Sequence, residues 1–266
     1  MAIQLNAHAA DVESTTQIAP AAAATQGTPL VAGSDAEQAL ATRFENGTLG
    51  PQYVRLNSAS GPFFARYEPA AIEPAQGAVL IVPGLAQRIG DEPVIDALIE
   101  EFPQAGWAVL AVQPALLPTA AAIEAYTALD QQTQERIAQA CARLAADGLT
   151  NIVVLGLEGG ATSARRFLAE DPTATVITGF ATRGLWQGEV TEIGRPVIEF
   201  IGETDLAAAR LGEVRQRLAR REDAPYRRFS FAGIGRDFTG FEAEMARRLR
   251  GWIKSTVANP SLSSAQ

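Results

Sequence analysis

Continuous apolar segments separated by helical patterns limit the possible folds of this chain more than any other feature. Four of them lie at residues 78–82, 107–112, 152–155 and 197–201 and consist almost entirely of apolar residues. A strand that is apolar on both faces needs cover on both faces, which is typical of parallel strands flanked by helices. Because helical spacing fills the intervals, the sequence predicts an α/β protein with a mostly parallel sheet and helices on both faces.

The remaining segments add an antiparallel edge and further elements to this sheet. Residues 53–57 and 63–67 read as short strands joined by a turn of Ser, Ala, Gly and Pro, which predicts two antiparallel strands at the N-terminal edge. Two more strands are expected at residues 175–177 and 226–231. Helices are expected at residues 92–104, 119–146, 206–221 and 238–252.

The two ends of the chain differ from its middle in composition. Residues 1–50 are rich in Ala, Thr, Gln, Gly and Pro and poor in large apolar side chains, so we expect a flexible arm with a short helix near residues 36–44. Residues 51–254 form the expected single domain, and residues 255–266 a disordered tail.

The first residues leave the cellular compartment open. Ala7-His8-Ala9 fits the small-residue pattern of a secretory cleavage site, but the charged and apolar regions of a signal peptide are missing. One interpretation is a start within a longer signal peptide, which predicts a periplasmic protein. The other is an ordinary Ala-rich arm on a cytoplasmic protein. Both interpretations stay open.

Composition excludes several classes of protein. The net charge of −8 argues against general nucleic-acid binding, and no apolar run approaches the ~20 residues of a membrane span. The single cysteine, Cys141, excludes an internal disulfide and is expected to be a small buried hydrophobe within a helix. No metal-ligand spacing and no Gly-x-Gly-x-x-Gly loop is present, so we expect neither a metal nor a cofactor.

The run at residues 152–161 joins an apolar strand to a glycine-rich turn and a helix. The turn Gly156-Leu157-Glu158-Gly159-Gly160 has the spacing of a nucleophile elbow, in which glycines avoid clashes around a strained central residue. Four more segments follow the same order as in α/β-hydrolases: residues 80–87, 105–107, 196–205 and 233–242. Together they resemble that superfamily, and more closely an uncharacterised bacterial family of α/β-hydrolase-like proteins catalogued as a domain of unknown function. The resemblance covers about residues 53–254 and implies the α/β-hydrolase fold.

The resemblance also points to the three positions of a catalytic triad. Glu158 stands where the nucleophilic Ser is found, and Arg236 stands at or beside the position of the His. Asp205 matches the acid, although it also precedes a helix and fits an N-cap. A guanidinium has a pKa above ~12 and cannot act as a base, and the one histidine, His8, lies in the arm. We therefore expect Arg236 to form a static ion-pair cluster with the two carboxylates.

These substitutions favour a protein that is inactive by the usual mechanism and binds or scaffolds an unknown small molecule or protein. Gly84 and Leu85 correspond to the oxyanion loop, whose N–H groups could hold a carboxylate, a phosphate or the Glu158 side chain. The alternative is a hydrolase that uses Glu158 and Asp205 as a carboxylate nucleophile or an acid/base pair. The sequence leaves the oligomeric state open.

A basic run follows the third triad segment. Glu213, Glu222 and Asp223 balance part of it, so a solvated surface is expected, and docking to an acidic partner or anionic surface is the alternative. Its members are Arg215, Arg217, Arg220, Arg221, Arg227 and Arg228.

Overall fold

A computed structural model describes residues 35–117, 125 and 129–257 of the chain. Its eight strands form one sheet in the order β1-β2-β4-β3-β5-β6-β7-β8. β1 and β2 pair antiparallel, β2 pairs antiparallel with β4, and every pair from β4 to β8 is parallel, which confirms the predicted fold class. The strands are β1 (Tyr53–Ser58), β2 (Gly61–Glu68), β3 (Gly77–Val82), β4 (Trp107–Val112), β5 (Ile152–Leu157), β6 (Ile177–Arg183), β7 (Val197–Gly202) and β8 (Tyr226–Phe231).

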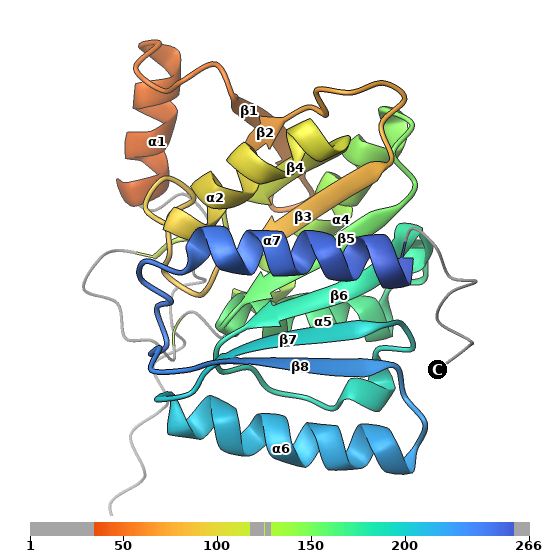
Figure 1. Cartoon of the computed structure of the whole chain (residues 1–266). Helices are drawn as coiled ribbons and strands as arrows, with labels where there is room; N and C mark the ends of the chain where they lie inside the picture. The colour runs from red at the N-terminus through yellow and green to blue at the C-terminus, as the bar shows by residue number, and fades with distance from the viewer. Residues whose placement is uncertain (1–34, 118–124, 126–128, 258–266) are drawn as a thin grey trace, which may run out of the picture. The chain divides into compact units, whose positions relative to one another are not determined.

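The helices cover both faces of this sheet. In Figure 1, α2 and α7 lie in front of the strands, and α4 and α5 lie behind them. The described helices are α1 (Asp35–Glu45), α2 (Pro93–Glu101), α4 (Asp130–Ala146), α5 (Gly159–Glu170), α6 (Leu206–Arg221) and α7 (Glu242–Trp252). Short helical turns are η1 (Pro103–Ala105), η2 (Pro172–Val176), η3 (Val190–Glu192) and the π-helical η4 (Ile253–Val257).

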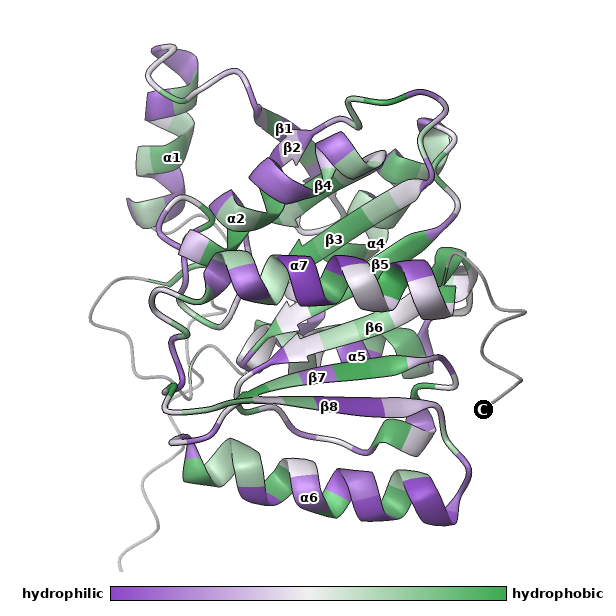
Figure 2. Ribbon diagram, viewed as in Figure 1, coloured by the Kyte–Doolittle hydropathy of each residue, from purple (hydrophilic) through white to green (hydrophobic). Residues whose placement is uncertain are grey.

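Alternation along a strand divides the core into two layers. In β3, Leu80 packs with the α4 and α5 side, whereas Val79 and Ile81 pack with the α2 and α7 side. Figure 2 shows the middle strands β3 and β5 in the colour of hydrophobic residues, while the outer faces of α6 and α7 carry polar ones. Burial on both faces explains why these strands read as continuous apolar runs. No helix among the described residues is long and apolar enough to cross a membrane.

The short helix expected near residues 36–44 is present as α1, and it packs on the rest of the domain. The helix α1 belongs to the expected flexible arm, yet Leu40 is buried against Phe64 and Leu116, and the rings of Phe44 and Phe64 are 5.3 Å apart. Leu40 and Phe44 are four residues apart and so share one face of an otherwise polar helix. Residues 1–34 lie outside the described residues. At the other end, residues 255–257 of the expected tail belong to η4.

One predicted element differs from the structure, and a second is described only in part. The strand expected at residues 175–177 is mostly the turn η2, and the real strand is β6. Gly179 and two threonines make β6 look less apolar than its neighbours, because Gly179 leaves room for the Trp252 ring, only 3.1 Å from where a Cβ would lie. The expected helix at residues 119–146 is described as α4, and most of its first ten residues lie outside the described residues.

The basic run is not a uniform solvated surface. Arg215 is buried, and its guanidinium binds Glu199 of β7, which is 0 % exposed. The same carboxylate accepts hydrogen bonds from the Trp186 indole at 2.9 Å and from the Tyr226 hydroxyl. Burial, followed by the Glu199 charge, raises the pKa of Tyr226. Arg217, Arg220, Arg221 and Arg227 are exposed, as expected for a solvated face.

Ionisation of Cys141 is expected to make the fold less stable at alkaline pH. It is buried, as predicted, and burial raises its pKa to about 12. The unfolded thiol ionises near ~8.5, so the stabilisation is complete below that pH and is lost as the pH rises toward the folded value, by up to about 1.4 kcal/mol per pH unit. Urea unfolding at pH 8 and pH 10 should therefore show a smaller loss of stability for Cys141→Ala than for the wild type. Equal losses would contradict the prediction.

Candidate functional site

The turn between β5 and α5 keeps the geometry of a strained elbow. Glu158 has φ 49° and ψ −120°, a conformation that is essentially restricted to glycine. A Cβ on Gly156 would lie 2.2 Å from Ala161 Cα, and one on Gly160 would lie 2.1 Å from Pro83 O. Both glycines are therefore sterically required, and the backbone presents the Glu158 side chain at the carboxyl end of the central strand.

Backbone strain at the elbow predicts that a glycine substitution stabilises the fold, whereas such substitutions usually destabilise it. We expect Glu158→Gly to stabilise the fold by about 1 kcal/mol, because glycine adopts this conformation without strain. The control is Glu213→Gly at an exposed position in the middle of α6, where the same change should destabilise by about 0.5–1 kcal/mol. Chemical denaturation of both variants measures the difference, and destabilisation of similar size in both would contradict a strained Glu158.

The Glu158 side chain is half-buried and has no charged partner. It lies against Gly184, where an added Cβ would be 3.1 Å from Glu158 Cγ, and its own N–H donates to Arg183 O at 2.8 Å. Within the described part of the chain, the carboxylate makes no hydrogen bond or ion pair. The elbow therefore presents a carboxylate that pairs with none of the described residues.

The loop after β3 brings a second backbone donor to the elbow. The position of a Cβ on Gly159 is 3.5 Å from Leu85 N, so these two residues are adjacent. Neither Leu85 nor Gly159 uses its N–H for a hydrogen bond to any described residue. The N–H of Gly84 is bound by Gln87 Oε1 at 2.7 Å, so only Leu85 of the two expected loop residues offers a free donor. Two neighbouring backbone N–H groups beside Glu158 therefore bind no described residue.

Asp205 and Arg236 come together at the ends of β7 and β8. Asp205 caps α6, with Oδ1 accepting from Ala208 N at 3.2 Å, and its Oδ2 lies 3.5 Å from Arg236 Nε. Capping and ion pairing therefore coexist at this carboxylate. Of the three-membered cluster expected from the sequence, the structure forms this pair without Glu158.

Sequence reasoning missed a buried ion pair beneath the elbow. Arg183 ends β6 and is 2 % exposed, and its two terminal nitrogens bind the Glu92 carboxylate at 3.1 and 3.2 Å. Arg183 also donates to Asp237 O at 3.2 Å, while Glu92 caps α2. The pair therefore joins the end of β6, the start of α2 and the loop that carries Arg236. If β6 had been predicted with its observed bounds, Arg183 would have stood at the carboxyl end of a central strand, where functional residues gather. That position is the sequence signal that could have revealed the ion pair.

The fold of this chain is similar to that of known hydrolase structures. A putative dienelactone hydrolase from Klebsiella pneumoniae subsp. pneumoniae superposes with a TM-score of 0.60 at 13% identity, over 76% of this chain and 98% of that one. This is an α/β-hydrolase fold. An esterase from Pyrococcus furiosus gives 0.61 at 14% identity over 80% and 93% of the two chains, and a lidless α/β serine hydrolase from Xanthomonas campestris gives 0.60 at 10% over 77% and 95%.

Sequence comparisons say less about this chain than the structural comparison does. Residues 1–129 match a family described as "Protein of unknown function (DUF3530)". No curated protein matches the sequence. The identities to the solved hydrolases are too low to carry over an activity, so they describe the fold alone.

A pocket of about 170 Å³ adjoins the elbow of this α/β-hydrolase fold. Leu85 and Gly159 line it, together with a polar group at the facing starts of α4 and α5. In that group, Asp130 binds Ser163 Oγ and Arg166 Nη1, the latter at 2.7 Å. These polar side chains are already paired with one another. The groups of the site without a partner among the described residues include the two N–H donors, Glu158 and the side-chain amide of Gln187. The described residues contain no cluster of His, Cys, Asp and Glu that could hold a metal ion.

Proposed function

We propose that this α/β-hydrolase-fold chain does not hydrolyse esters by a Ser-His-Asp mechanism and that its elbow has a binding or scaffolding role. One observation carries the proposal: the strained elbow presents Glu158, while Arg236, in the loop where the histidine is expected, is ion-paired with Asp205. A guanidinium stays charged at neutral pH and cannot accept a proton from a nucleophile or from water.

The free groups at the elbow describe the ligand that would suit it. The N–H groups of Leu85 and Gly159 favour an oxygen acceptor, such as a carbonyl. The unpaired Glu158 carboxylate favours a positively charged or hydrogen-bond-donating group and disfavours a free carboxylate or phosphate beside it. A small ligand with a carbonyl oxygen and an amine would satisfy both requirements.

The position of Glu158 keeps one alternative open, in which its carboxylate attacks a substrate. A glutamyl ester would form, and water would then have to hydrolyse it with the help of a base. Asp205, the second carboxylate of this alternative, already binds Arg236 and caps α6, which weakens its suitability as that base. The binding role is therefore the better-supported proposal.

Activated esters test the proposal directly. Purified wild type, Glu158→Gln and Glu158→Ser would be offered p-nitrophenyl esters and a fluorophosphonate probe. We expect no turnover above the buffer rate and no labelling for any of the three proteins, because Arg236 stands where the histidine base is expected. Thermal denaturation would show that the variants remain folded. Turnover by the wild type that Glu158→Gln abolishes would establish the alternative and overturn the proposal.

A further inference from the structure

A second pocket lies at the opposite end of the parallel strands from the elbow. It has a volume of about 440 Å³ and lies between the starts of β3 and β4 and the last turns of α7. This volume is within the usual range of small-molecule sites, about 300–1,000 Å³. Its lining includes Gln76, Trp107, Arg247, Arg250, Gly251 and Lys254.

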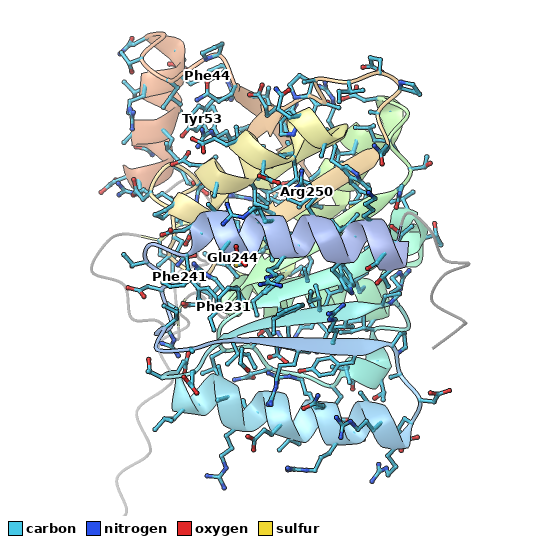
Figure 3. All side chains as sticks on the ribbon, in the orientation of Figure 1. Phe44, Tyr53, Phe231, Phe241, Glu244 and Arg250 are labelled. Atoms are coloured by element: carbon cyan, nitrogen blue, oxygen red, sulfur yellow. The ribbon has the colours of Figure 1, made fainter. Side chains whose placement is uncertain are left out.

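The lining is strongly basic in a protein whose net charge is −8. Arg247, Arg250 and Lys254 follow one another at steps of three and four residues, so they lie on one stripe of the helix (Figure 3 labels Arg250). Three positively charged side chains therefore stand along the same side of the pocket.

Both guanidinium groups keep donors for a ligand. Arg247 binds Glu244 Oε2 through Nε and Nη2, at 3.2 and 2.8 Å, and Arg250 Nε lies 2.9 Å from Glu101 Oε1. Nη1 of Arg247 and both terminal nitrogens of Arg250 make no interaction with any described residue. About half of each side chain is exposed, so these nitrogens are accessible from the pocket. Arginine forks match the oxygens of phosphate and carboxylate groups.

Trp107 adds a hydrogen-bond donor to the same lining. The residue is only 3 % exposed, and Gly77 makes room for its ring, since a Cβ there would lie 2.7 Å from the indole. The indole N–H donates no hydrogen bond within the described part of the chain, and its nitrogen is not fully shielded from solvent. It can therefore donate to an oxygen of a ligand in the pocket.

We infer that this basic pocket, at the amino end of the sheet, binds a small polyanion that carries phosphate or several carboxylate groups. The three positive charges hold the anionic groups, and the Trp107 indole donates to one of their oxygens. The site is separate from the elbow, so binding here is independent of the proposed loss of hydrolytic activity.

Calorimetric titration of the full chain with pyrophosphate, citrate and inorganic phosphate at low ionic strength tests the inference. We expect saturable binding of pyrophosphate or citrate. Tighter binding of pyrophosphate would indicate a ligand with phosphate groups, and tighter binding of citrate would indicate one with carboxylate groups. Arg247→Gln, Arg250→Gln and Trp107→Phe should each weaken binding by about tenfold, the loss expected from one charge-assisted hydrogen bond. Trp107→Phe keeps an aromatic ring in the lining and removes only the N–H.

Two further variants make the result decisive. Arg248→Gln is the matched control, because Arg248 also binds Glu244 but packs over the Phe229 ring instead of lining the pocket, and its affinity should equal that of the wild type. Gly251→Glu adds a negative charge to the lining at a position where a Cβ meets no atom within 4 Å, so the protein should stay folded and lose binding. Absence of saturable binding for all three anions, or equal affinity in Gly251→Glu and Arg248→Gln, would overturn the inference.

Discussion

Replacing Arg183 by methionine is expected to destabilise the fold by about 3–5 kcal/mol, because it leaves a buried charge without its partner. Glu92 is 7 % exposed and receives two hydrogen bonds from Arg183. The substitution also removes the donor to Asp237 O, which anchors the loop that carries Arg236. Urea unfolding at pH 7 measures the loss.

A double variant separates this cause from a general packing defect. Arg183→Met/Glu92→Gln should lose less stability than Arg183→Met alone, because the amide leaves no buried charge without its partner. Equal losses of stability in the two variants would argue for lost packing only.

A loss of similar size is expected at the second buried network, below β7. Glu199→Gln removes the charge that balances Arg215, and about 3–5 kcal/mol should be lost because a buried guanidinium is left uncompensated. In the wild type, Trp186 and Tyr226 donate to the two oxygens of the Glu199 carboxylate. The amide of the variant has only one acceptor oxygen for these two donors.

Glu213→Gln is the matched control for this network. Glu213 lies on the same helix as Arg215, is exposed, and should change stability by no more than about 0.5 kcal/mol. Guanidinium denaturation of both variants makes the comparison. If the two variants lost equal amounts of stability, the Glu199 network would not contribute as a buried ion pair.

Both networks show where the sequence was informative and where it was not. The arginines around residue 215 read as one basic run, because the sequence shows which residues are charged but not which of them are buried. The helix α6 turns Arg215 inward and its neighbours outward, and only its packing on β7 brings Glu199 within reach. The polar residue inside the apolar run at 197–201 was visible, but its partners come from three other segments.

Several features of the elbow could be predicted from local sequence. The strand, the flanking glycines and the charged residue between them are contiguous, so their geometry depends on short-range sterics. Asp205 as an N-cap is equally local, because the cap and the helix it begins are adjacent in sequence. The Arg236 contact with Asp205 followed from the position of two loops at the same end of the sheet.

The sequence by itself determined the α/β class, the parallel sheet with its antiparallel edge, and the glycine-flanked turn that carries Glu158, since each depends on residue type and local periodicity. The tertiary structure decided which charges are buried together. Glu92 and Arg183 are 91 residues apart, and Arg247 and Trp107 are brought to one pocket only by the packing of α7 on the sheet. Desolvation and pairing depend on these long-range contacts, which no local pattern in the chain encodes.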